Sequence, residues 1–270
     1  MYETEAQALQ DPRTDLTSAS GEMSGEPRDQ LLDRVRTVWA ALAEVPAGSF
    51  SCGTARVLVS PGSQICPSGW VGVVELGGAV VATAPSQRAA ERLRVALASR
   101  SDETIDLASH LSQKLAVAEV LGPAGLYYPP SDVRVPRAAD RVESMPVENA
   151  DVQRLLGSVE DDDAQESGLA SISSRAFVAR VDGLVVSAAG YRHWPHDVAH
   201  LCVLTAASMR RRGLASRTAG AAVANALDHG LLPQWRARPS ASRRIAEHLA
   251  FQHFGWQLSL RLTSKPETAT

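Results

Sequence analysis

The chain has 270 residues, 44% of them hydrophobic, and a formal net charge of −3 at pH 7. This length and apolar content favour two domains with ordinary hydrophobic cores, and the acidic balance argues against a broad nucleic-acid-binding surface. Three cysteines without metal-ligand spacing argue against a disulfide framework and against a metal site. No segment is long and apolar enough to cross a bilayer, and residues 1–28 lack the apolar core of a signal peptide, so we expect a cytoplasmic protein.

The N-terminal half begins with a polar segment. Residues 1–27 carry too few apolar side chains to pack, and we expect them to be disordered. Residues 28–136 are expected to form a smaller N-terminal α/β domain, and 137–145 a linker. The predicted elements are a helix from residue 29 that ends before Pro46, a strand at 56–59, hairpin strands at 71–75 and 79–83, and helices at 86–99 and about 105–115. The Pro- and Gly-containing stretch 122–136 is interpreted as the end of this domain.

The C-terminal half, residues 146–262, is expected to form the second domain, followed by a flexible tail at 263–270. Its acidic run at 160–163 has the composition of a solvated loop. The predicted elements are a helix at 152–159, hairpin strands at 177–181 and 184–191, a strand at 199–205, a helix at 214–229, a strand at 231–237, a helix at 242–249, and a last strand ending at 262.

The most informative segment is the basic turn Arg210-Arg211-Arg212-Gly213-Leu214-Ala215, between a buried strand and an Ala-rich helix. The first amides of a helix have no intrahelical partner and lie at the positive end of its dipole, so they favour an anion. Small residues let a phosphate reach the backbone, and a pyrophosphate would fit there. The alternative is an ordinary strand–helix connection with solvated arginines.

Two motifs in this order resemble the GNAT superfamily of acyl-CoA-dependent N-acetyltransferases. The first is Cys202-Val203-Leu204-Thr205 followed by Arg210-x-x-Gly213-x-Ala215, which looks like the superfamily's cofactor motif. The second is Ser242-Arg243-Arg244-Ile245-Ala246-Glu247-His248-Leu249-Ala250-Phe251, similar to the helix that usually ends in Leu-Gly-Phe. The resemblance covers about residues 146–262 and implies an α/β fold of the α+β type, with a mixed, mostly antiparallel sheet flanked by helices. The N-terminal domain resembles a degenerate copy of the same fold.

The resemblance also implies where acetyl-CoA, the expected cosubstrate, would bind. Pantetheine would lie where the strand ending at Thr205 splays from the strand around Trp235, and an amide such as that of Val203 could stabilise the oxyanion of the reaction. The expected cofactor-binding residues are Val203, Leu204, Thr205, Arg210, Arg211, Arg212, Gly213, Leu214, Ala215 and Ser216. No metal is expected.

The candidate catalytic residues are His200 and Glu166. His200 lies on the strand where the superfamily often has a carboxylate base, and an ordinary histidine pKa of about 6.5 suits a base. The alternative is a half-buried histidine bonded to a carbonyl. Glu166 could act as a base or as an anchor for the amine, or belong to a solvated loop. The chain departs from the superfamily at Ala246, where many relatives carry a tyrosine that protonates the leaving thiolate, and at Ala250, where glycine is expected.

These observations predict transfer of an acetyl or short acyl group to a primary amine, by direct attack in a ternary complex. A small-molecule amine is favoured over a protein, because the acidic segment 160–166 could attract a cationic compound. The alternative is a non-catalytic CoA-binding sensor or scaffold, which the missing tyrosine motivates. Neither nucleic acid nor a membrane is expected as a partner. The sequence leaves the oligomeric state open, with a homodimer as one option, and the N-terminal domain is expected to shape the acceptor pocket or an interface.

Overall fold

The structure is a computed structural model, and it describes residues 28–51, 55–98, 107–130, 133, 142–238 and 240–263. The predicted disorder of residues 1–27, most of the predicted linker and nearly all of the predicted tail lie outside the described residues. None of the helices within these ranges is long and apolar enough to cross a membrane.

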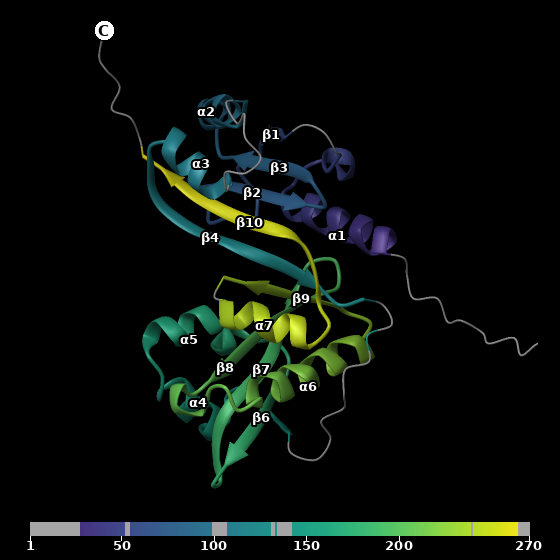
Figure 1. Cartoon of the computed structure of the whole chain (residues 1–270), viewed down its shortest axis with the longest axis vertical. Coiled ribbons are helices and arrows are strands. Elements are labelled where there is room, and N and C mark those ends of the chain that lie inside the picture. Colours follow the sequence, from purple (N-terminus) through teal and green to yellow (C-terminus); the bar gives the residue numbers. More distant parts are fainter. Residues whose placement is uncertain are drawn as a thin grey trace, which may run out of the picture.

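A single mixed sheet of ten strands runs through the molecule (Figure 1), in the order β1-β3-β2-β10-β4-β9-β8-β7-β6-β5. The neighbours β1 and β3, and β8 and β9, are parallel, and every other neighbouring pair is antiparallel. This confirms the expected α/β class with a mixed, mostly antiparallel sheet. The strands are β1 (Arg56–Val59), β2 (Val71–Leu76), β3 (Ala79–Ala84), β4 (Val117–Tyr128), β5 (Glu143–Met145), β6 (Ala176–Val181), β7 (Leu184–Trp194), β8 (Val198–Thr205), β9 (Leu232–Ala237) and β10 (Gln252–Leu262).

Helices cover both faces of the sheet. Buried side chains place α1 and α4 on one face, and α2, α3, α6 and α7 on the other. The helices are α1 (Arg28–Leu42), α2 (Gln87–Ala98), α3 (Leu107–Lys114), α4 (Ala150–Leu156), α5 (Asp161–Ser167), α6 (Leu214–Asp228) and α7 (Ser240–His248), with short 3-10 turns η1 (Ala47–Ser49), η2 (Leu169–Ser171) and η3 (Ala207–Met209).

The acidic run is a helix, α5, where a loop was expected. Its first turn holds Asp161, Asp162 and Asp163, and no residue of the helix is buried. Carboxylates near the positive end of a helix dipole stabilise it by about 0.3–1 kcal/mol each. The acidic composition therefore favours the start of a helix as well as a solvated loop.

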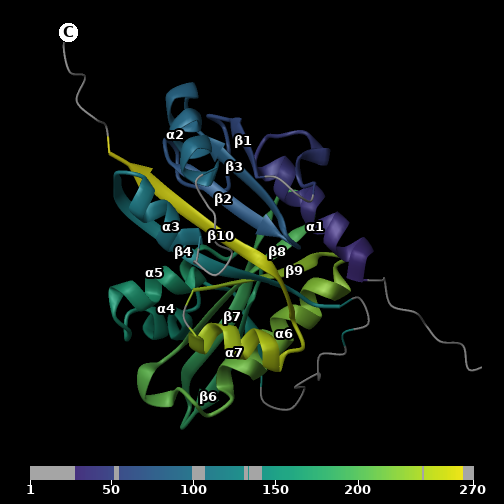
Figure 2. The same ribbon diagram turned by 45° about the horizontal axis from the view of Figure 1, so that its top comes forward.

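Sequence reasoning missed two strands: the short β5, which lies in the predicted linker, and the long β4, because Gly122 and Pro123 suggested the end of a domain. Strand β4 instead lies between β9 and β10, and β10 pairs on its other side with β2 (Figure 2). Its pairing with β10 shifts register around these two residues. Such an irregularity accommodates a proline, which has no N–H for the ladder. Strands that precede and strands that follow the predicted linker thus belong to one sheet, and the division into two domains stays a prediction.

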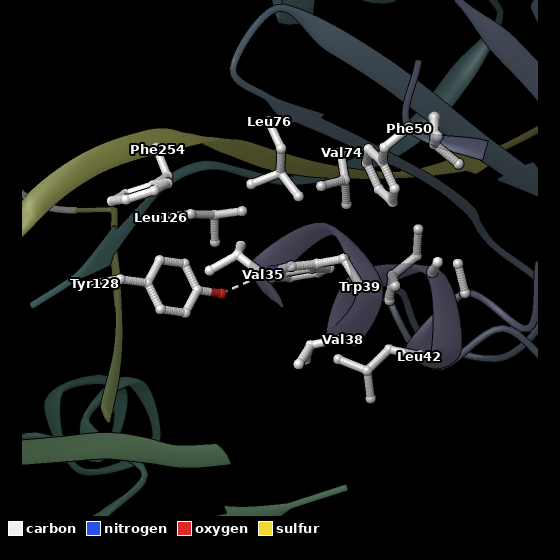
Figure 3. Packing of buried hydrophobic residues seen from close by; sticks show 14 of the residues in the cluster. Val35, Val38, Trp39, Leu42, Phe50, Val74, Leu76, Leu126, Tyr128 and Phe254 are labelled. Atoms are coloured by element: carbon white, nitrogen blue, oxygen red, sulfur yellow. Dashed lines mark hydrogen bonds between the residues drawn. The ribbon is translucent and has the colours of Figure 1, made fainter. Parts of the chain in front are cut away.

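Helix α1 is joined to the centre of the sheet by buried polar contacts (Figure 3). The indole Nε1 of Trp39 donates a hydrogen bond to the hydroxyl of Tyr128 on β4, at 2.7 Å, and neither side chain reaches solvent. The same hydroxyl accepts a second bond from Nε2 of Gln234 on β9, at 2.7 Å. A buried polar group without a partner costs about 1–3 kcal/mol, so these contacts favour one packing of α1 over β4 and β9.

Ala250, just after α7, provides a test of local backbone strain. Its φ is +60°, in the left-handed region that glycine usually occupies after a helix. We expect Ala250→Gly to raise the free energy of unfolding by about 0.5–1 kcal/mol, because relief of the strain exceeds the entropy that glycine adds to the unfolded chain. Urea unfolding would measure the difference. Ala89→Gly, inside α2, should instead lose about 1 kcal/mol, and an Ala250→Gly protein no more stable than the parent would contradict the strain.

Candidate functional site

A gap opens between β8 and β9 near the centre of the sheet. The two parallel strands pair at Val198 with Leu232, Ala199 with Pro233 and His200 with Gln234, and pairing stops there. Both strands continue, β8 to Thr205 and β9 to Ala237. The divergence expected from the resemblance is therefore present.

The edge of β8 that faces this gap has unpaired backbone groups. The amide of Ala206 donates to the carbonyl of Val186 at 2.9 Å, which continues the antiparallel ladder between β7 and β8. Hydrogen-bonding residues alternate along such a ladder, so the backbone of Leu204 is directed toward β7 and that of Val203 and Thr205 toward the gap. Leu204 therefore contributes no free backbone group there, unlike its two neighbours.

The first turn of α6 lies just beyond the end of β8 and has free amides. Gly213 stands at its N-cap position with φ +74° and no side-chain cap, and the amide of Arg217 makes the first bond of the helix, to the carbonyl of Gly213. Among the described residues, nothing accepts from the amides of residues 211–216. A Cβ added at Gly213 would meet no atom within 4 Å, so the backbone is open to a ligand. This geometry fits the anion site expected from the sequence.

Three buried hydroxyl groups fix α6 to the end of β8. Ser187 on β7 lies 2.8 Å from the hydroxyl of Thr205 and 3.2 Å from that of Thr218 on α6. The hydroxyl of Thr218 also bonds the carbonyls of Leu214 and Ala215 in the first helical turn. The cluster holds the free amides of α6 beside the open edge of β8. Sequence reasoning missed it, although polar residues inside otherwise apolar stretches were a usable signal.

The arginines of the basic turn differ in their surroundings. Arg210 makes an ion pair with Asp163 of α5 at 2.5 Å, and its Nε donates to the carbonyl of Thr205 at 3.4 Å. Arg212 lies against the sulfur of Met209. Arg211, with φ +64°, has no partner among the described residues. The charge of Arg210 is thus partly neutralised by α5.

Helix α5 is connected to both sides of the gap. Asp163 pairs with Arg210, which follows β8, and Glu166 pairs with Arg238, which follows β9, with Arg238 Nε donating to Oε1 of Glu166 at 2.9 Å. Glu166 would have to give up Arg238 before anchoring an amine. Its role as a base or anchor stays a prediction.

The pairing of Asp163 with Arg210 predicts an effect on cosubstrate affinity. Asp163→Asn should free Arg210 for an anion and tighten acetyl-CoA binding about 2- to 5-fold, because an exposed ion pair is worth about 0.2–1 kcal/mol. Titration calorimetry would measure the Kd. Asp162→Asn is the matched control, since Asp162 is exposed on the same helix and has no partner among the described residues. Equal Kd values for both variants would show that Asp163 does not compete with the ligand.

His200 lies at the last paired position before the gap, partly buried. Its ring stacks on Trp194 with centroids 4.4 Å apart, and its Nδ1 lies 3.0 Å from Oε1 of Gln234. Burial, together with the positive charge of Arg236 and Arg192, lowers the pKa of His200 to about 3. An imidazole with this pKa binds a proton weakly, unlike the ordinary histidine that the sequence suggested. The role of His200 as a base stays a prediction.

Several residues on the His200 face of the sheet were not assigned to the site from sequence. Trp194 and Arg192 come from β7, and Gln234 and Arg236 from β9. His200 on β8 is paired with Arg192 on β7 along one edge of its strand and with Gln234 on β9 along the other edge. Strand alternation places residues two apart on one face, so the register of the three strands would have grouped these side chains.

Neither described cysteine has the character of a nucleophile. Burial raises the pKa of Cys202 to about 11 and that of Cys66 to about 11, so both remain thiols at neutral pH. Cys52 lies outside the described residues. Ala246, at the position of the expected tyrosine, is fully buried in the packing between α7 and β9. Within the described part of the chain, no group of three or more His, Cys, Asp or Glu residues could hold a metal ion.

Comparisons with solved structures give weak global similarity. A protein from Streptococcus suis described as GCN5-related N-acetyltransferase-like is 15% identical, covers 86% of this chain and 99% of that chain, and has a TM-score of 0.46. A protein from Novosphingobium aromaticivorans described as an acetyltransferase of the GNAT family is 23% identical, with coverages of 55% and 67% and a TM-score of 0.44. A GCN5-related N-acetyltransferase from Kribbella flavida is 21% identical, with coverages of 59% and 64% and a TM-score of 0.40.

A sequence comparison gives one family match. No curated protein matches the chain. The family model described as GNAT acetyltransferase matches residues 164–255, which include the second half of α5, the β8–β9 gap, the basic turn and α7. In this region, the chain is similar to the GNAT acetyltransferases, which are acyl-CoA-dependent transferases.

Proposed function

We propose that the protein transfers an acetyl or short acyl group from acetyl-CoA to the primary amine of a small molecule. The observation that carries the proposal is the open edge of β8 beside the uncapped first turn of α6. An extended ligand with an anionic group needs backbone partners along its length and free amides at its charged end. These two features supply both, in the order that the resemblance implies.

In this proposal, the amides of residues 211–216 bind the pyrophosphate, with Arg210, Arg211 and Arg212 adding positive charge. Backbone groups of Val203 and Thr205 bind the pantetheine arm along the gap. A bound thioester supplies the electrophilic carbonyl. The amide of Val203 donates to the carbonyl oxygen as negative charge develops on it, and two substrates held in one site lose much of the entropic barrier to reaction.

Direct attack in a ternary complex is supported by the state of the cysteines. Burial raises the pKa of Cys202 to about 11, which leaves almost no thiolate at neutral pH to form an acyl-enzyme. The amine nitrogen therefore bonds to the acyl carbon, the C–S bond breaks, and CoA leaves as the thiolate. A thiol has a pKa of about 8.5, so the thiolate is a tolerable leaving group even without a general acid. Ala246 stands where many relatives carry the tyrosine that serves as this acid.

The proton that the amine must lose passes most readily to water in this proposal. A base with a pKa of about 3 accepts a proton from an ammonium group poorly, so His200 is better suited to orient groups than to remove protons. Glu166 is the other candidate, and it is held by Arg238. If His200 is the base, the His200→Ala variant should lose turnover when it is assayed across a range of pH values.

The experiment is an amine panel with detection of released CoA thiol. We expect thiol release with at least one small primary amine, and initial-velocity plots that intersect, as in a ternary-complex mechanism. Parallel plots would contradict direct transfer and indicate an acyl-enzyme. Binding of acetyl-CoA without thiol release from any amine would favour the CoA-binding sensor instead.

A further inference from the structure

Arg236 is a charged residue on the His200 face of the sheet that the proposed transfer does not use. It comes from β9, two residues past Gln234 and so beyond the last pair with β8. Its Nη1 donates to Oε1 of Gln257 on β10 at 3.0 Å, and its guanidinium lies 5.7 Å from the ring centroid of Trp194. Neighbours on two sides therefore hold the guanidinium above the sheet beside the gap.

This guanidinium has no counter-charge among the described residues. Each carboxylate that forms an ion pair among these residues pairs with an arginine other than Arg236. Arg236 is solvent-exposed, yet desolvation by the surrounding protein lowers its pKa. The guanidinium is therefore open to solvent while it packs against Trp194 and Gln257. A partly desolvated cation that lacks an anion binds one more strongly than a freely solvated arginine does.

Arg192 supplies a second positive charge near His200 and Arg236. Arg192 on β7 is exposed and has no carboxylate partner in the described part of the chain. Its charge and that of Arg236 both lower the pKa of His200, which lies between the two strands. His200 is uncharged and Gln234 and Gln257 are amides, so the polar groups around the guanidinium leave its charge uncompensated.

The position of this charge separates it from the expected phosphate site. The free amides of α6 follow the end of β8, whereas Arg236 lies on β9 and on the sheet face opposite α6 and α7. Pantetheine in the gap would place the thioester near Val203, between these two regions. An anion at Arg236 would then belong to the second substrate.

We propose that Arg236 binds a carboxylate of the acceptor, so that the substrate is a small amine that also carries a carboxylate. This inference rests on the proposed acyl transfer and names its substrate class. A planar guanidinium offers five N–H donors in a fork that matches a carboxylate, and only one of them is used by Gln257. Arg192 supplies additional attraction.

This substrate class replaces the cationic compound that the acidic segment suggested. In the structure, Asp163 and Glu166 of that segment are paired with Arg210 and Arg238. The charge of these two carboxylates is compensated, whereas Arg236 has no counter-charge among the residues that the structure describes. The electrostatic preference of the site therefore favours an anionic group on the acceptor.

The first test measures binding without turnover. Succinate is titrated at constant ionic strength into protein saturated with acetyl-CoA, which covers the phosphate site, and succinamide is the uncharged comparison. We expect saturable succinate binding that weakens at least about 10-fold in Arg236→Gln and less in Arg236→Lys, because the lysine keeps the charge and loses the fork. Arg88→Gln, which removes the same charge from an exposed position on α2, should bind as the parent does.

The second test measures turnover of matched acceptors. 3-Aminopropanoate and 4-aminobutanoate are compared with propylamine and butylamine by thiol release. We expect kcat/KM to be at least about 10-fold higher for the amino acids, and to fall about 10- to 100-fold in Arg236→Gln for these acceptors alone. The two alkylamines should change less than about 2-fold, and the Kd for acetyl-CoA should be unchanged in the same variant.

The outcomes separate the two proposals. Succinate binding that is absent, or that is equal in the parent and Arg236→Gln, would overturn the carboxylate site, whether or not amines are acetylated. An equal fall in kcat/KM for the amino acids and for the alkylamines would also overturn it. Succinate binding that depends on Arg236, without acetylation of any amine, would support the anion site and contradict the acyl transfer.

Discussion

Gly213→Val is expected to weaken acetyl-CoA binding at least about 100-fold, whereas Gly230→Val should leave the Kd unchanged. The free amides of the first turn of α6 carry the proposed phosphate site. A β-branched residue disfavours the φ of +74° at Gly213, so the chain would shift there and move these amides. Loss of two hydrogen bonds to a charged group, at about 1.5–3 kcal/mol each, gives an effect of this size.

The two glycines make a matched pair. Gly230 follows the other end of the same helix with φ +72°, and a Cβ at either glycine would meet no atom within 4 Å. Both variants should therefore lose about 1–2 kcal/mol of stability for the same backbone reason, and only one of them lies at the proposed site. Titration calorimetry gives the Kd, and urea unfolding gives the stability. Tight binding by Gly213→Val would show that the phosphate lies elsewhere.

Acid is expected to destabilise the protein through His200, and His200→Gln should remove that part of the effect. Burial and neighbouring positive charge lower the pKa of His200 from 6.5 to about 3 in the folded state. Between these values the unfolded chain binds the proton more readily, so stability is full above pH 6.5 and falls as the pH falls toward 3. From pH 7.5 to 4.5 the expected loss is about 2.5 kcal/mol.

Urea unfolding of the parent and His200→Gln at pH 7.5, 5.5 and 4.5 would measure this difference. Glutamine keeps a polar partner for Gln234 and does not titrate. All other groups are shared, so the difference between the two pH profiles isolates His200. Parallel profiles would show that His200 titrates normally in the folded protein. That result would restore the imidazole as a candidate base.

Local sequence patterns were sufficient for much of the C-terminal region. The Asp182-Gly183 turn, the helix after the basic turn and the alternating strand ending at Leu262 all form as predicted. These features depend on contacts between residues close in the chain, such as turn geometry and the spacing of apolar side chains. The free amides at Gly213 follow from the same local reasoning.

Contacts between residues far apart in the chain could not be predicted from these local patterns. Strand β4 contains Gly122 and Pro123, which locally favour a turn, yet pairing with β9 and β10 on its two sides outweighs that preference. The lowered pKa of His200 depends on burial within the folded sheet and on Arg236 and Arg192, which come from two other strands. No spacing within one segment could indicate the register that brings them together.

The sequence by itself therefore determined the class of fold, the position of the proposed anion-binding turn before α6 and the family resemblance, since each is encoded within a few consecutive residues. Only the tertiary structure decided that Glu166 is paired, that His200 is held neutral and that Arg236 has no counter-charge in the described part of the chain. Charge balance at a site depends on which strands and helices become neighbours. That neighbourhood is set by the packing of the whole sheet, in which residues far apart in the chain meet.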